Sequence, residues 1–469
     1  MGRPATGGIP ALALVAVVLG ALTVGLASNA LTPSLPILRA SFHSGFDSLE
    51  WVLNAYSVAL LTGLIPAGRI ADLVGRKKVF LIGAAGLMIT LPLMGLSTGT
   101  TMLIGLRALQ GLAAAALLSA GLGALRDLFP VGGLPWAFGA WGAALALSMG
   151  GGPLILALLA ERESWRIPFY GLVLPALLTL VFGAVGMRDS RRTGIPRPLD
   201  VVGVALLTVT LFLLSFGLAN EIADGWSTPL TLLPLVAAAG LGVAFVLVSV
   251  LVQPALFASR TVAAGLVTLL GFFTGFGTLT FANAHLQTVD GMNLTGMGVR
   301  LLPMGATFLL ASIASAALTR QFGARPPLVA GALLIAVPAF GFALVDAGSL
   351  TPAFVLVCLA VLGLGLGLVA VAGAFAAIGD AAQELPAVAA GFQQAALALG
   401  GILASSVLGS MVSSRVSSVT SEPGPGFPGA SVRGLMTVLV DAWQNALLVA
   451  GVVALVAAVV ALLVRPRPR

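Results

Sequence analysis

The charged residues of this chain are few, and one short segment places a carboxylate next to two cations. It reads Gly68-x3-Asp72-x2-Gly75-Arg76-Lys77. The carboxylate of Asp72 can pair with a cation or accept hydrogen bonds at a helix N-terminus. Gly68 allows close contact between helices, and Gly75 permits a left-handed turn. The segment predicts an ordered polar contact between helices, with an ordinary basic loop as the alternative.

A second polar group, Arg107 with Gln110, lies inside an apolar stretch. An arginine in a membrane span is costly, so Arg107 is a candidate functional residue. Its guanidinium can favour the ionised form of a nearby carboxylate, or it can hydrogen-bond the backbone and Gln110. A third possibility is that its long side chain reaches a nearby membrane interface.

The third feature is the run Gly150-Gly151-Gly152-Pro153, again inside an apolar stretch. Proline removes a helix hydrogen bond and glycine makes a helix thin, so Gly152 and Pro153 predict a bend and close helix packing. A simple kink without further purpose is the alternative.

Side chains suited to bond chemistry are scarce. All 16 Asp and Glu residues lie near the ends of apolar stretches or between them. The two histidines, His43 and His285, and the single Cys358 give no metal site by their spacing. We therefore expect no catalytic residue, no metal and no cofactor. A membrane enzyme, a non-transporting receptor or scaffold, and a channel with a regular polar face are all disfavoured.

The composition indicates what positions these residues. Of the 469 residues, 59% are hydrophobic and only 8% are charged, and the mean hydropathy is +1.09. A soluble enzyme, a disordered protein and a disulfide scaffold are excluded, which leaves an all-α membrane protein with many spans. The net charge of +7 comes from basic residues in short, separated loops, so we expect no nucleic-acid partner.

Hydropathy predicts fourteen spans, and basic residues predict their orientation. With the N-terminus inside, sixteen of the 23 Lys and Arg residues fall in cytoplasmic loops and five fall outside, which favours cytoplasmic termini. The spans are approximately 10–36, 51–71, 79–97, 101–125, 136–159, 167–187, 201–219, 230–252, 262–286, 297–319, 327–346, 351–379, 386–412 and 436–464.

Taken together, these motifs resemble the major facilitator superfamily. The segment 68–77 is similar to its signature loop between spans two and three, Leu103-x3-Arg107-x2-Gln110-Gly111 to its fourth-span motif, and 150–153 to the Gly-Pro motif of its export branch. Further likenesses to the fourteen-span drug:proton antiporter branch are Trp51-x4-Tyr56, Trp165-Arg166-x2-Phe169, Leu286-Gln287, Arg300-Leu301-Leu302-Pro303 and Glu384-Leu385-Pro386 with Gly391.

The resemblance implies a major facilitator fold with 14 transmembrane helices, in which two inserted helices separate two six-helix lobes. The implied domains are 1–190, 191–255 and 256–469. It further implies a monomeric exporter of lipophilic drugs or natural products in the bacterial inner membrane, working by alternating access, with protons as partner. The signature loop would act as the conformational switch. An uncoupled facilitator or an uptake carrier is the alternative.

One departure from the family pattern lies in the first span. The membrane-embedded Asp that usually precedes a Leu-Pro pair by about nine residues is replaced by Ala27. This weakens the expectation of proton coupling through that residue and of cation neutralisation. Residues that would line the substrate path by the resemblance are Asn29, Thr32, Asn54, Tyr56, Trp141, Phe272, Phe276, Gln393 and Gln394.

Overall fold

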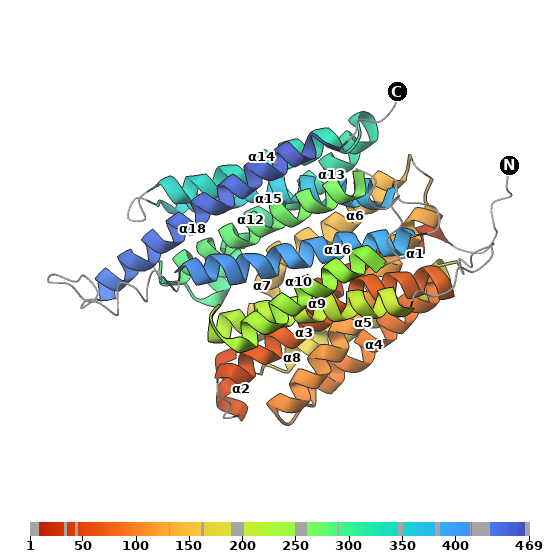
Figure 1. Ribbon diagram of the computed structural model, residues 1–469, viewed down its shortest axis with the longest axis horizontal. Coiled ribbons are helices and arrows are strands. Elements are labelled where there is room, and N and C mark those ends of the chain that lie inside the picture. Colours follow the sequence, from red (N-terminus) through yellow and green to blue (C-terminus); the bar gives the residue numbers. More distant parts are fainter. Residues whose placement is uncertain are drawn as a thin grey trace.

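The protein was analysed as a computed structural model, and the fold it describes is helical. The described residues are 9–31, 35–42, 46–130, 132–160, 164–188, 201–248, 260–288, 290–345, 350–379, 385–412, 414 and 432–464. Within them the long helices run side by side as one elongated bundle (Figure 1). Thr32, predicted to line the substrate path, lies outside the described residues.

Helices from the N-terminal part of the chain pack mainly on one another and form what we call the first group. Its members are α1 (Pro10–Asn29), α2 (Leu35–Phe42), α3 (Phe46–Val74), α4 (Arg76–Gly95), α5 (Thr100–Leu128), α6 (Leu134–Ala146), η2 (Leu147–Gly151), α7 (Gly152–Ala160) and α8 (Ile167–Gly186). In this group α5 packs against α3 and α4, and α8 packs against α1 and α4. Buried alanines such as Ala114, Ala115 and Ala120 on α5 allow this close packing.

Helices from the C-terminal part form the second group in the same way. Its members are α12 (Arg260–Thr288), α13 (Leu294–Phe322), α14 (Arg325–Leu344), α15 (Pro352–Ala374), η4 (Phe375–Gly379), α16 (Pro386–Leu403), η5 (Ala404–Leu408) and α18 (Val432–Ala461). The two groups meet along two seams. In one seam α16 contacts α3 and α5, and in the other α13 contacts α6, η2 and α7.

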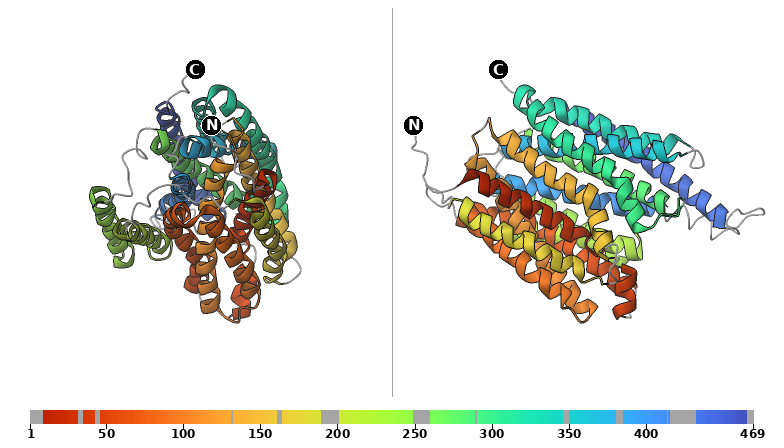
Figure 2. Two further views of the ribbon diagram at one scale, coloured as in Figure 1. Left: turned by 90° about the vertical axis from the view of Figure 1, so that its right-hand side faces the viewer. Right: turned by 180° about the vertical axis from the view of Figure 1, so that it is seen from behind.

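Two further helices, α9 (Val201–Asp224) and α10 (Pro229–Val248), pack on each other and stand at one side of the bundle (Figure 2, left). Helix α9 contacts both groups: Trp51 of α3 lies against Phe216, with ring centroids 5.3 Å apart. On the other side the hydroxyl of Ser406 donates to the carbonyl of Leu218, 2.9 Å away.

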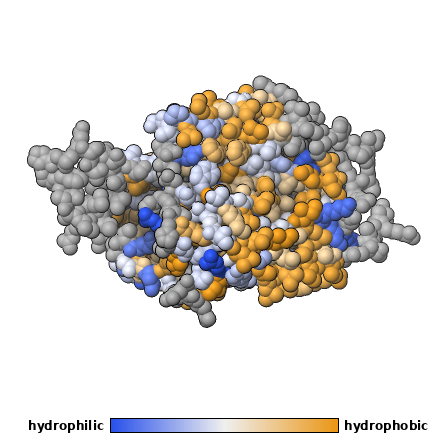
Figure 3. All heavy atoms as spheres, turned by 90° about the horizontal axis from the view of Figure 1, so that it is seen from below, coloured by the Kyte–Doolittle hydropathy of each residue, from blue (hydrophilic) through white to orange (hydrophobic). Residues whose placement is uncertain are grey.

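The predicted number of fourteen spans is not confirmed. In the described residues, twelve helices are long and apolar enough to cross a membrane. The other two predicted spans coincide with α9 and α10. Their apolar described stretches, Ala205–Asn220 and Pro229–Phe245, are shorter than 18 residues, whereas each of the twelve helices has at least that length. The shell around the bundle is nonetheless apolar: Figure 3 shows a broad hydrophobic area on one face, with hydrophilic residues toward its ends.

The predicted first span is also too long. It was expected to run to residue 36, but α1 ends at Asn29, and Leu35 with Pro36 begins the separate short helix α2. The sequence contains the physical reason, because Pro33 and Pro36 lack the backbone N–H that would continue a helix.

Candidate functional site

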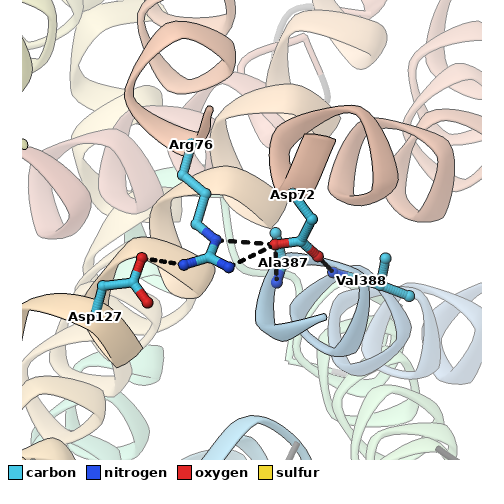
Figure 4. A network of polar contacts seen from close by, with 5 residues as sticks. All are labelled: Asp72, Arg76, Asp127, Ala387 and Val388. Carbon is cyan, nitrogen blue, oxygen red and sulfur yellow. Dashed lines mark hydrogen bonds and ion pairs between the residues drawn. The ribbon is translucent and has the colours of Figure 1, made fainter. Parts of the chain in front are cut away.

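Asp72 is the centre of a polar network of five residues (Figure 4). Asp72 lies in the last turn of α3, and we call this end of the bundle the Asp72 end. Its Oδ1 accepts from Nε of Arg76 at 2.9 Å and from the backbone N–H of Ala387 at 3.2 Å. Its Oδ2 accepts from the N–H of Val388 at 3.0 Å. The guanidinium of Arg76 also pairs with Asp127. The network therefore connects α3, α4 and α5 to the start of α16.

Local structure explains why these groups meet. Asp72 lies in the last turn of α3, and Gly75 has φ 118°, a conformation that favours glycine, before α4 begins at Arg76. Helix α16 begins with Pro386, so the N–H groups of the next two residues are its first free donors. The side chain of Asp72 thus caps a helix of the other group, where negative charge is favourable.

Glycines bring the backbones together around this network. A Cβ at Gly123 of α5 would lie 2.7 Å from Cα of Ala387, and a Cβ at Gly391 of α16 would lie 3.0 Å from the carbonyl carbon of Leu64. A Cβ at Gly68 would overlap the carbonyl oxygen of Ala387. At these positions any side chain would force α16 away from α3 and α5.

Of the residues predicted for this site, Gly68, Asp72, Gly75 and Arg76 come together, whereas half-buried Lys77 is not among the five residues of the network. Asp127 was missed by the sequence analysis. The signal for it was present, because Asp127 and Arg126 end a predicted span on the same side as Asp72. The hydrogen bonds from the backbone N–H groups of residues 387 and 388 could not be predicted from the types of these residues.

The second seam is built around Gly150 and Pro153. Residues Leu147–Gly151 form a π-helical turn that ends two residues before Pro153, which accommodates a proline that lacks the helix N–H. A Cβ at Gly150 would collide with Cα of Gly305 on α13, and one at Gly298 would lie 2.6 Å from Cα of Leu154. Backbones therefore touch directly here, and the run does more than kink one helix.

Arg107, on α5, is fully buried among the helices. The predicted alternative, in which its side chain extends to a membrane interface, is therefore wrong for this structure. Its Nε donates to the carbonyl of Val52 at 3.1 Å, and Nη2 donates to the carbonyl of Ser28 at 3.1 Å. Nη1 donates to the carbonyl of Ala27 at 3.0 Å and to Oε1 of Gln110 at 2.8 Å. Every one of these acceptors is neutral.

The predicted lining residues within the described part of the chain lie on five helices, α1, α3, α6, α12 and α16. Tyr56 is buried beside Arg107, whose Cζ lies 4.5 Å from its ring centroid. Gln393 donates to Thr268 at 3.0 Å, which joins α16 to α12. The others are distributed as follows: Asn29 is exposed at the end of α1, Asn54 is half-buried on α3, Trp141 is buried on α6, Phe272 and Phe276 contact each other on α12, and Gln394 is buried on α16.

Comparisons with known proteins agree on one family. The model described as Major Facilitator Superfamily matches residues 17–405. The "Tetracenomycin C resistance and export protein" of Streptomyces glaucescens is 35% identical over 424 residues, which cover 89% of this chain and 79% of that protein. The "Multidrug resistance protein Stp" of Mycobacterium tuberculosis is 28% identical, with 88% and 77% covered.

Solved structures show the same fold at low sequence identity. The human organic anion transporter MFSD10 (TETRAN) has a TM-score of 0.66 at 17% identity, with 95% of this chain and 99% of that chain covered. The proton:xylose symporter XylE has a TM-score of 0.63 at 14% identity, with 94% of each chain covered.

Proposed function

Because the chain belongs to the Major Facilitator Superfamily, we propose that it is a secondary transporter that exports lipophilic drugs or natural products by alternating access. The names of its relatives, a tetracenomycin C resistance and export protein and multidrug resistance proteins, support this direction and substrate class. The first and second groups of helices would be the two lobes that rock against each other, corresponding to residues 1–190 and 256–469.

The observation that carries this proposal is the contact of Asp72 with the first N–H groups of α16. It is a polar contact between groups of helices, made through one carboxylate, and it joins α3 to the start of α16 at one end of the bundle. A contact of this kind can be made and broken as a unit, because a lost backbone cap can be replaced by water. The Asp72 network would therefore hold the state that is closed at this end.

We place the Asp72 end in the cytoplasm. Lys77 and Lys78 follow Arg76 there, and Arg126 lies beside Asp127, so this end is rich in the cations that are retained inside. On this assignment the termini are cytoplasmic and the protein lies in a bacterial plasma membrane. The state described here would then be closed to the cytoplasm, which suits release of cargo to the outside.

Proton coupling is the finer part of the proposal. Family likeness favours it, whereas Ala27 leaves the first span without an acid. The neutral partners of Arg107 favour the second candidate, an uncoupled facilitator or uptake carrier, because no carboxylate accepts a hydrogen bond from Arg107 in the described part of the chain.

Inverted membrane vesicles test the proposal. We expect a lipophilic fluorescent dye to accumulate inside them when a proton gradient is imposed, and the accumulation to stop with an uncoupler or in Asp72→Asn. Movement that survives the uncoupler would favour the uncoupled facilitator. Absence of movement for a panel of such dyes, with the protein present in the vesicles, would contradict drug export.

A further inference from the structure

Around Arg107 the bundle contains a group of buried hydrogen-bond donors. Some of these donors have no acceptor within the described residues. We call Tyr56, Arg107 and Gln110 the donor cluster. It lies inside the first group, at the end opposite Asp72 and about 10 Å from the start of α5 at 1.5 Å per residue. All three side chains are at least 98% buried.

The donors can be counted. A guanidinium has five N–H groups, and Arg107 uses four of them on three carbonyls and on Oε1 of Gln110. The contact at Oε1 fixes the amide orientation, because the opposite orientation would turn an NH2 group toward a cation. The NH2 group of Gln110 and the hydroxyl of Tyr56 have no partner within the described residues.

The charge of the cluster has one sign. Carbonyl oxygens solvate a guanidinium without neutralising it, and a buried unpaired charge is unfavourable. The ring of Tyr56 covers one face of the guanidinium, 4.5 Å from its Cζ, and supplies a cation–π contact but no negative charge. Ala27, whose carbonyl accepts from Nη1, contributes only a methyl group where a carboxylate side chain would have matched the charge.

We propose that the donor cluster recognises a lipophilic anion through a carboxylate or phenolate oxygen of the cargo. Such an oxygen would accept from the free N–H groups of Arg107 and Gln110 and from the Tyr56 hydroxyl, and it would neutralise the buried cation. Because all three side chains are buried here, the anion enters when the helices around them separate. The inference rests on the proposed export function and narrows its substrates to anions.

Binding to the purified, detergent-solubilised protein tests this with two dyes, anionic fluorescein and cationic ethidium. We expect fluorescein to bind at least tenfold more tightly than ethidium. The isosteric Gln110→Glu variant keeps the acceptor for Arg107 but adds a compensating charge, so fluorescein affinity should fall about tenfold and ethidium affinity should rise. Gln321→Glu, at an exposed position in the last turn of α13, makes the same change in net charge elsewhere and should change neither affinity.

Tyr56→Phe is a milder variant, which tests the inference even if Gln110→Glu does not fold. The hydroxyl has no partner in the described part of the chain, so its removal should leave the melting temperature unchanged while weakening fluorescein binding severalfold. Ethidium binding equal to or tighter than fluorescein binding, binding of neither dye, or unaltered fluorescein affinity in both variants would overturn the inference.

Vesicle transport separates this inference from the proposed function. Tight fluorescein binding without movement in vesicles would leave the anion site standing and contradict export. Export of ethidium in preference to fluorescein would support export and overturn the anion site.

Discussion

Asp72 accepts hydrogen bonds from backbone groups 315 and 316 residues further along the chain. One carboxylate thereby holds two helices of different groups, while Arg76 compensates its charge at 2.9 Å. Arg107 shows the opposite arrangement, a cation surrounded by neutral acceptors. The two sites differ in one respect: the charge of Asp72 is paired with Arg76, whereas the donor cluster pairs its cation with no carboxylate in the described part of the chain.

At the residue scale we predict that Asp72→Asn destabilises the closed end by about 2 kcal/mol, because the hydrogen bonds it weakens involve a charged acceptor. Dye export should fall at least tenfold, and the melting temperature of the purified protein should drop. Asp127→Asn is the matched control. This substitution changes a residue that contacts Arg76 but leaves the hydrogen bonds between Asp72 and α16 intact. Equal effects of the two substitutions would contradict the assigned role.

At the scale of elements, the two groups of helices meet at positions where glycines let the backbones approach closely. The seam at α16 depends on Gly68, Gly123 and Gly391, and the seam at α13 depends on Gly150 and Gly298. Between these seams each group keeps its own packing. Glycines thus allow backbone contact at both seams, as they also do within each group, where a Cβ at Gly111 would overlap the carbonyl oxygen of Tyr56.

A pair of substitutions on α5 tests the first seam. We expect Gly123→Ala to push α16 outward, because its Cβ would lie 2.7 Å from Cα of Ala387, and to lower both transport and melting temperature. Gly105→Ala on the same helix meets nothing within 4 Å and should be neutral or slightly stabilising. The assay is dye export at matched membrane levels, and parity of the two variants would count against the seam.

The second seam allows an even closer comparison between adjacent residues. Gly150→Ala would collide with Gly305, whereas Gly151→Ala meets nothing within 4 Å. We expect the first substitution to abolish most transport and to reduce the amount of folded protein in the membrane, and the second to leave both unchanged. Size-exclusion chromatography in detergent gives the folded fraction. A tolerated Gly150→Ala would show that the backbones can separate without loss.

At the scale of the whole molecule, the question is which side each end faces. In a Cys358→Ala background, we expect a membrane-impermeant maleimide to label Lys78→Cys only in inverted vesicles and Thr98→Cys only in intact cells, because exposed residues 78 and 98 bracket α4. Ser227→Cys, exposed between α9 and α10, should be labelled from outside if that pair crosses the membrane. Labelling of 78 and 98 from one side would overturn the proposed topology.

Much of the fold was predictable because a bilayer leaves few options. Apolar stretches of span length predict helices, so the twelve membrane-length helices fall at predicted spans. The Asp72 segment was predictable as a polar contact, since charges in so apolar a chain need partners. The break after Asn29 was not anticipated, because the hydropathy of residues 30–36 continues that of α1 and only the prolines oppose it.

The partners within the sites were mostly out of reach of the sequence. Residue type does not reveal that backbone N–H groups at 387 and 388 would meet Asp72, nor which carbonyls would accept from Arg107, because every residue carries the same backbone groups. The hydrogen bond between Arg107 and Gln110 was within reach, since the two residues are one helical turn apart. Which side of its helix each lining candidate occupies follows from helix rotation, which hydropathy leaves undetermined.

The cap on α16 has a consequence for how the bundle opens. When Asp72 withdraws, the N–H groups of Ala387 and Val388, which are buried here, lose their acceptors, and that loss is tolerated only if water takes their place. Separation of the helices and wetting of this end must then occur as one event. A dry, half-open intermediate would be the least stable state of the cycle.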